Sequence, residues 1–138
     1  MIEQPVLPSV FRMLARGLIR RCARCGSGHL YPSWFRLVKR CPRCGYLFDR
    51  EEGFFLGAFV INFGVTEVCL GVVLAVLIGL EASGGVSLLP IYAAAAAVVV
   101  IVPIINYPFS KTTWAAIDMI MHREQVFADY PGPAGRIT

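Results

Sequence analysis

The chain has 138 residues, enough for one domain or for a small domain joined to a short membrane hairpin. Apolar residues make up 57% of the chain and charged residues only 16%, whereas soluble domains carry about 25% charged residues. Ten of the thirteen lysines and arginines lie in residues 1–50, and residues 53–105 contain none. The net charge of +4 therefore belongs to a basic front end, and the composition argues against an ordinary soluble domain.

Residues 1–21 form a basic leader. It lies at the N-terminus, as a targeting peptide does, but it lacks the other features of one. Arginines interrupt it, and it has no long apolar run and no small-residue cleavage site, so we do not interpret it as a secretory signal. We expect a basic amphipathic leader helix that begins after Ser9 and ends near Arg20. Such a helix either packs on the module that follows or lies on anionic inner-leaflet lipid, and the nearby membrane span favours the lipid.

Residues 22–48 contain two cysteine pairs, each followed by a glycine. The pairs are Cys22 with Cys25 and Cys41 with Cys44, and fifteen residues separate them. This spacing predicts a zinc ribbon, because two intervening residues let both sulfurs of a pair approach one ion at about 2.3 Å. The glycines let the chain turn beneath the sulfurs, where backbone N–H groups can donate to them. Four thiolates leave no position for water, so we expect one structural zinc ion per chain.

Other uses of the four cysteines fit the sequence less well. Disulfides need an oxidising compartment, and redox-active pairs come singly beside a βαβ unit, which this sequence lacks. A rubredoxin-type iron site has the same four ligands, so zinc and iron both remain open. No activated nucleophile, phosphate loop or open metal site is recognisable, and we therefore expect that the protein is not an enzyme.

Residues 49–109 are predicted to form a transmembrane hairpin. Asp49 suits the start of a helix, and the two spans cover about 53–80 and 88–105, close to or above the roughly 20 residues that cross a bilayer. Pro103 should kink or end the second span. The loop between the spans has no lysine or arginine, whereas both flanks carry them. The positive-inside rule thus predicts a multi-pass protein of the inner (plasma) membrane with both termini in the cytoplasm.

The first span also contains polar and small residues at membrane depth. Glu67 lies about 21 Å along the helix from the start of the span, near mid-bilayer, and Asn62 and Thr66 lie closer to the cytoplasm. A charge there is costly, so Glu67 is either a neutral acid bonded across a helix interface or a proton relay, and we favour the first. Small residues form a helix-packing stripe that faces Ala93–Ala97 or another subunit. Its glycines include Gly53, Gly57, Gly64 and Gly71.

Residues 110–128 predict a third helix, which Ser110 would cap. It is too polar to span the membrane, so we expect an interfacial amphipathic helix with Trp114 at the depth of the lipid headgroups. Residues 129–138 are rich in proline and glycine and predict a flexible tail. The expected fold is thus a membrane all-α protein with a zinc ribbon, a two-helix hairpin and an interfacial helix.

Several of these features together resemble one protein family. The paired knuckles are followed at once by Arg-Glu-Glu-Gly-Phe-Phe-Leu-Gly-Ala at residues 50–58, and Lys111 and Trp114 follow the second span. The chain resembles the bacterial family of domain of unknown function 983 over roughly residues 18–127. That family has no established activity. Some of its members are encoded near genes for respiratory oxidases, which implies a role in respiratory assembly.

Three functions fit these features. The first is a non-catalytic accessory subunit or assembly factor that docks on a partner complex, or on its own copies, through the glycine stripe. The second is an ion or proton carrier that uses Glu67. The third is a membrane-tethered nucleic-acid binder, but the basic and aromatic residues of the ribbon suit anionic lipid equally well. Two helices are too few to enclose an ion path, so we favour the accessory role.

Overall fold

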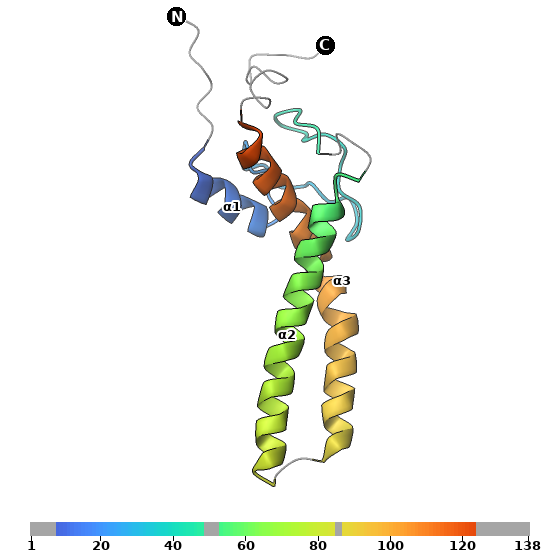
Figure 1. Cartoon of the computed structure of the whole chain (residues 1–138). Coiled ribbons are helices and arrows are strands. Elements are labelled where there is room, and N and C mark those ends of the chain that lie inside the picture. Colours follow the sequence, from blue (N-terminus) through green and yellow to red (C-terminus); the bar gives the residue numbers. More distant parts are fainter. Residues whose placement is uncertain (1–7, 49–52, 85–86, 124–138) are drawn as a thin grey trace, which may run out of the picture.

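The computed structural model describes residues 8–48, 53–84 and 87–123. They form a helical hairpin with a head at one end, and the head consists of residues 8–48 and the last part of the second long helix (Figure 1). No strand occurs among these residues, although two isolated β-bridges lie within the cysteine module. This confirms the all-α class, with a four-cysteine module ahead of two long apolar helices. The helices are α1 (Val10–Leu18), α2 (Leu56–Ala82) and α3 (Leu88–Met121).

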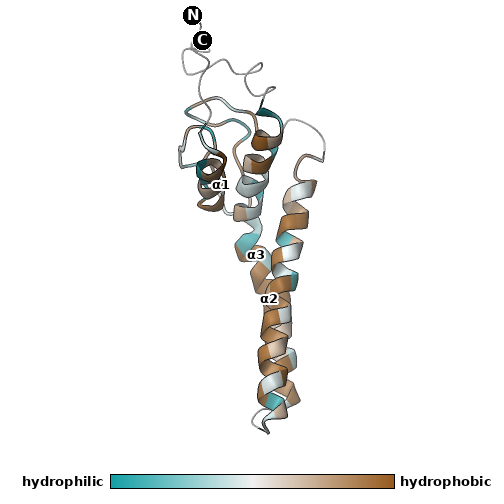
Figure 2. Ribbon diagram, turned by 60° about the vertical axis from the view of Figure 1, so that its left-hand side comes forward, coloured by the Kyte–Doolittle hydropathy of each residue, from teal (hydrophilic) through white to brown (hydrophobic). Residues whose placement is uncertain are grey.

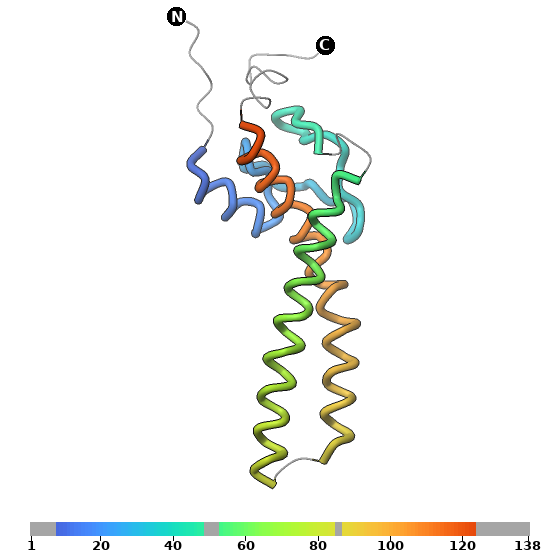
Figure 3. Tube along the Cα trace, viewed as in Figure 1, coloured from blue at the N-terminus to red at the C-terminus, as the bar shows by residue number. Residues whose placement is uncertain are grey.

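The hairpin consists of α2 and the first part of α3, which run side by side in opposite directions (Figure 1 and Figure 3). Each helix is long and apolar enough to cross a membrane, and 6% or less of either apolar window is buried inside the protein. Figure 2 shows that most residues of the hairpin are hydrophobic, and large apolar side chains such as Phe59, Val72 and Leu89 are exposed. A core helix of a soluble protein would bury this surface, so the exposure fits contact with lipid.

α1 lies across the head and packs on the last part of α3. Met13 and Gly17 are its buried residues, and a Cβ added at Gly17 would lie 2.9 Å from the Cβ of Ala116. The two backbones therefore approach closely. Thr112 Oγ1 donates a 2.7 Å hydrogen bond to the Gly17 carbonyl, which also accepts the Arg20 N–H at 3.2 Å. The expected start after Ser9 is confirmed, although the Ser9 side chain makes no capping bond.

The structure corrects the predicted boundary between the second span and a separate helix over residues 110–128. α3 continues through Pro103 and Pro108 to Met121, and its ribbon bends in this region (Figure 1). Pro108 has no N–H to donate to the carbonyl of Ile104. Trp34 Nε1 donates to this carbonyl instead, at 2.9 Å. The head thus supplies a donor that the helix lacks, and the helix continues where a break was expected.

The last part of α3 belongs to the core of the head and does not lie apart at the interface as expected. It packs with Met13 of α1 and with Leu30 and Tyr46 of the cysteine module. Trp114 packs on α2, because a Cβ added at Gly57 would lie 2.3 Å from its ring. The buried residues of this part of α3 are Ser110, Thr112, Ala115, Ala116, Asp118 and Met119.

The first span also begins later than expected. Gly53 precedes α2 and has a φ of +86°, a backbone conformation that favours glycine, so it is not part of the helical stripe. The proposed cap at Asp49 and the tail at 129–138 lie outside the described residues.

Candidate metal centre

Both cysteine pairs fold into the same tight turn. In the first, the Gly26 N–H donates to the Cys22 carbonyl at 2.8 Å, and the Cys22 N–H donates to the Ser27 carbonyl at 2.9 Å. The second pair repeats both bonds at 2.9 Å through Cys41 and Gly45. The two glycines have φ values of +75° and +70°, a backbone conformation that residues other than glycine rarely adopt. The predicted reversal of the chain beneath the sulfurs is confirmed.

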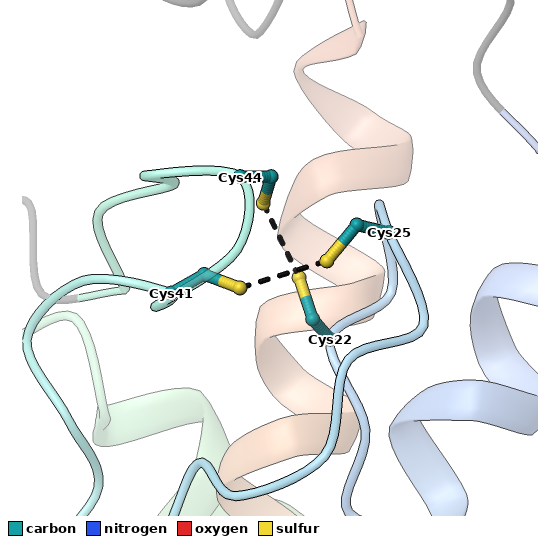
Figure 4. Close-up of side chains that lie close together, drawn as sticks. All are labelled: Cys22, Cys25, Cys41 and Cys44. Carbon is teal, nitrogen blue, oxygen red and sulfur yellow. Dashed lines mark hydrogen bonds between the residues drawn. The ribbon is translucent and has the colours of Figure 1, made fainter. Parts of the chain in front are cut away.

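The four sulfurs converge on one point between the two turns (Figure 4). All lie within 4.8 Å of one another, and the Sγ–Sγ distances are 3.7 Å for Cys22–Cys44 and 3.6 Å for Cys25–Cys41. A disulfide would bring two sulfurs to about 2.0 Å, so all four cysteines are free thiols. A tetrahedral ion with metal–sulfur bonds of about 2.3 Å spaces its ligands about 3.8 Å apart. The four cysteines therefore fit a tetrahedral metal ion.

Hydrogen bonds between the sulfurs make them unequal acids. A hydrogen bond from Cys22 lowers the pKa of Cys25 to about 6, and the Ser27 backbone N–H adds to this effect. Hydrogen bonds from Cys22 and then Cys44 hold the pKa of Cys41 well below its usual range. The hydrogen bond to Cys25 contributes most to a raised pKa of Cys22, which is also buried. Two of the sulfurs are thus favoured as thiolates, the form that binds metals.

The head holds the two turns in place from both sides. The sulfurs of Cys22 and Cys41 belong to one core with Phe48 and with Met119 of α3. Arg16 of α1 donates from Nη1 to the carbonyls of Ala23 and Arg24 at 3.4 and 3.1 Å. The sequence left open whether the leader helix packs on the cysteine module or lies on lipid, and Arg16 of this helix contacts the first turn.

The polar residues of α2 fall into two groups. Asn62 and Thr66 are buried, and Asn62 Nδ2 donates to the Pro103 carbonyl of α3 at 3.0 Å. Asn106 Nδ2 donates to Asn62 Oδ1 at 3.0 Å, and Thr66 Oγ1 donates to the Asn62 carbonyl at 2.9 Å. The two bonds of Asn62 with Pro103 and Asn106 join the two helices at the proline bend. Glu67 is exposed instead, and it makes no hydrogen bond or ion pair with the part of the chain that the structure describes.

The predicted glycine stripe contacts the rest of the protein at one position on α2. Gly57 lies against Trp114, but a Cβ added at Gly64 or Gly71 would meet open space. Neither of these two glycines therefore faces Ala93–Ala97, and the expectation of packing within the hairpin is corrected. Packing against another chain stays a prediction.

The structure contains two cation–π contacts that the sequence analysis did not predict. The Arg20 guanidinium lies 4.8 Å from the ring centroid of Tyr31 and 4.9 Å from that of Trp34. The Lys111 ammonium lies 4.6 Å from the ring centroid of Tyr107. The basic and aromatic residues of the ribbon were recognised as a group, but the contacts join distant segments and leave no periodic signal.

The fold and the cysteine cluster together define a class of protein: a small helical hairpin with two candidate membrane spans and a head that can hold a metal ion. The chain belongs to the family described as Protein of unknown function (DUF983), whose family model matches residues 31–119. This match is shorter than the expected 18–127, and it contains the second cysteine pair but not the first. No curated protein and no solved structure matches the chain.

Proposed function

We propose that this protein is a non-catalytic accessory subunit or assembly factor of a larger membrane complex, with a respiratory complex as the expected partner. The observation that carries the proposal is the exposed Glu67, which lies between Gly64 and Gly71 on an apolar helix. An ionisable side chain that faces lipid is costly, and a hydrogen bond from a neighbouring helix reduces this cost. Open space at the two glycines allows that helix to come close.

The hairpin anchors the protein in this proposal, and the head lies in the cytoplasm. The basic residues cluster in the head and its flanks, and the loop at the far end of the hairpin has no lysine or arginine. This distribution supports insertion in the plasma membrane with both termini inside.

The metal site has a structural role in this proposal, and we assign it to zinc. Cys22, Cys25, Cys41 and Cys44 would hold the ion and, as four protein ligands, leave it no open position. When bound, the ion would cross-link the two turns of the head. The rigid head would then present its surface to the partner complex.

An ion carrier is the second candidate, and one cavity favours it. A depression of about 180 Å³ lies between α2 and α3, and Asn62, Thr66 and Glu67 line it together with apolar side chains. Polar groups beside an acid could pass a proton along a short path. The described parts of the two spans contain no other acid or base near it, however, and two helices do not enclose a channel.

Gly64→Leu, Glu67→Gln and Glu67→Ala distinguish the two candidates. For an accessory subunit, Gly64→Leu releases the partner because the leucine side chain occupies the space of the approaching helix, whereas Glu67→Gln keeps a hydrogen-bond donor and has little effect. Glu67→Ala removes the hydrogen bond and should weaken association. The control is Val76→Phe, which adds bulk on the side of α2 opposite Glu67, where Val76 is exposed.

The measurement is co-purification of the partner complex from native membranes, alongside proton flux in vesicles. Loss of function in Glu67→Gln with an intact complex would favour the carrier, because an amide cannot exchange a proton in that way. Equal effects of Gly64→Leu and Val76→Phe would contradict a docking surface on the glycine side of α2.

A further inference from the structure

Aromatic and cationic side chains gather where the head meets the hairpin, a region that we call the neck. Trp34 donates to the carbonyl of Ile104, and the Tyr31 hydroxyl donates to the carbonyl of Pro108. These bonds fix one loop of the cysteine module against α3 at the proline bend. The neck comprises Arg20, Tyr31, Trp34, Phe35, Tyr107 and Phe109.

The length of α3 places the neck at a defined depth. Pro108 lies 20 residues after Leu88, the first residue of α3, and this corresponds to about 30 Å of helix. The hydrocarbon core of a bilayer is about 30 Å thick. With the hairpin inserted, the neck therefore lies at the level of the lipid phosphates on the side of the head, where tryptophan and tyrosine are typically found.

A cationic depression of about 270 Å³ opens beside the neck. Arg20, Arg21 and His29 line it, and no acidic residue does. The Arg20 guanidinium carbon lies 4.8 and 4.9 Å from the ring centroids of Tyr31 and Trp34, and the Arg20 Nε is buried without a hydrogen-bond partner. A buried N–H donor without a partner calls for an acceptor, and a guanidinium is the group that best binds phosphate oxygens.

Two residues with positive φ border the same depression. Arg20 and His29 have φ values of +60° and +58°, and no other described residue except glycine has a positive φ. At Arg20 this conformation ends α1, because the Arg20 and Arg21 N–H groups donate to the carbonyls of Gly17 and Arg16 at 3.2 and 2.9 Å. The end of α1 thus turns the chain so that Arg20 and Arg21 both line the depression.

An apolar surface adjoins these cations. Ile19 lines the depression and is 59% exposed, and the neighbouring Leu18 is 58% exposed. Leu18 is the last residue of α1 and Ile19 follows it, at the end of α1 that lies nearer the hairpin (Figure 1). A free phosphate or a nucleic acid needs no such surface beside its phosphate, whereas the acyl chain of a lipid does.

We propose that this depression binds one anionic phospholipid, with the phosphate at Arg20 and Arg21 and an acyl chain along Ile19 and Leu18. Arg16 of the leader helix takes no part in this site, because its guanidinium is bound to the first cysteine turn. The proposal rests on insertion of the hairpin in a bilayer and is independent of any partner complex.

The test uses the full-length protein purified in a neutral detergent. Native mass spectrometry counts bound lipid during titration with phosphatidylglycerol or with phosphatidylcholine of the same chain length. We expect one phosphatidylglycerol per chain, bound at least roughly tenfold more tightly than phosphatidylcholine, as a charge-assisted contact implies. Inorganic phosphate at millimolar concentration should not displace it.

Arg21→Gln is the decisive variant, because Arg21 is exposed and its loss leaves the aromatic contacts of Arg20 intact. It should weaken phosphatidylglycerol binding about tenfold. Arg43→Gln is the matched control, because Arg43 is also exposed, and the second cysteine turn lies at the end of the head away from the hairpin (Figure 1). Arg20→Gln should abolish binding, and circular dichroism shows whether it folds.

Equal weakening by Arg21→Gln and Arg43→Gln would indicate diffuse charge attraction and overturn the site. Displacement of the lipid by inorganic phosphate would assign the depression to a free anion, and displacement by single-stranded RNA would assign it to nucleic acid. Recovery of the wild type in the soluble fraction would overturn insertion and the lipid site together. Membrane-inserted protein without selectivity for phosphatidylglycerol would overturn the lipid site alone.

Discussion

Glycines on one helix differ sharply in what surrounds them, and this difference separates packing within the chain from packing against another chain. At Gly57 an added Cβ would lie 2.3 Å from the ring of Trp114, whereas at Gly64 it would meet nothing within 4 Å. Gly57 is therefore needed for the contact between α2 and α3. Gly64 has no such role within the described residues.

Gly57→Ala and Gly64→Ala test this difference directly. We expect Gly57→Ala to lower the free energy of unfolding by about 1–3 kcal/mol, because the indole of Trp114 must move away from the new methyl group. Gly64→Ala should leave it unchanged, since the methyl group enters open space. The measurement is thermal unfolding in detergent, followed by tryptophan fluorescence. Equal stability of the two variants would contradict the close contact.

The two cysteine turns and the hairpin depend on different forces, so the elements should separate when the metal ligands are removed. A small metal-binding module gains much of its stability from the ion, whereas apolar helices in a bilayer need no metal. Figure 4 shows that the sulfurs come from two turns, and no disulfide joins them. A bound ion would therefore connect the two turns through its bonds to the sulfurs.

Cys41→Ser should therefore lose the metal and open the ribbon while the hairpin stays inserted. Metal analysis of the wild type should find about one zinc per chain, and the variant much less. Zinc should also dissociate as the pH falls, because protons compete for the thiolate ligands. Arg43→Gln serves as the control, because it changes an exposed side chain of the second turn and keeps all four ligands. Iron in place of zinc, or metal-free reduced protein, would contradict the assignment.

Elements that depend on neighbours in sequence could be predicted, and those that depend on distant residues could not. Cysteine spacing and hydropathy are local signals, so the clustering of the four cysteines and the two apolar helices were expected correctly. The continuity of α3 depends on Trp34, which lies 70 residues from its acceptor at Ile104. Likewise, residues 110–121 have a polar composition that predicted an interfacial helix. One face of this segment is buried because α1 and the cysteine module pack on it.

At the scale of the whole molecule, the composition of the head suits an aqueous environment and that of the hairpin suits a lipid environment. The described part of the hairpin is apolar and exposed, and the head carries most of the arginines (Figure 2). The bend at Pro103 and Pro108 divides α3 between the two environments. Orientation in the membrane and contact with a partner chain are therefore properties of the molecule as a whole.

Labelling of a cysteine at the tip of the hairpin tests the orientation. We expect Ser87→Cys to react with a membrane-impermeant thiol reagent in intact spheroplasts, because the loop without lysine or arginine should face outward. The wild type is the control for the native cysteines, which lie in the head and within α2. Labelling that requires a breached inner membrane would contradict the orientation.

The central claim is that the side of α2 around Glu67 contacts another protein chain within the bilayer. Photo-crosslinking in native membranes tests it most directly, with a photoreactive residue at position 64 and the same residue at position 76 as the control. We expect a specific protein adduct from position 64 and only lipid adducts from position 76, which lies on the side of the helix opposite Glu67. Lipid adducts alone at both positions would contradict the claim.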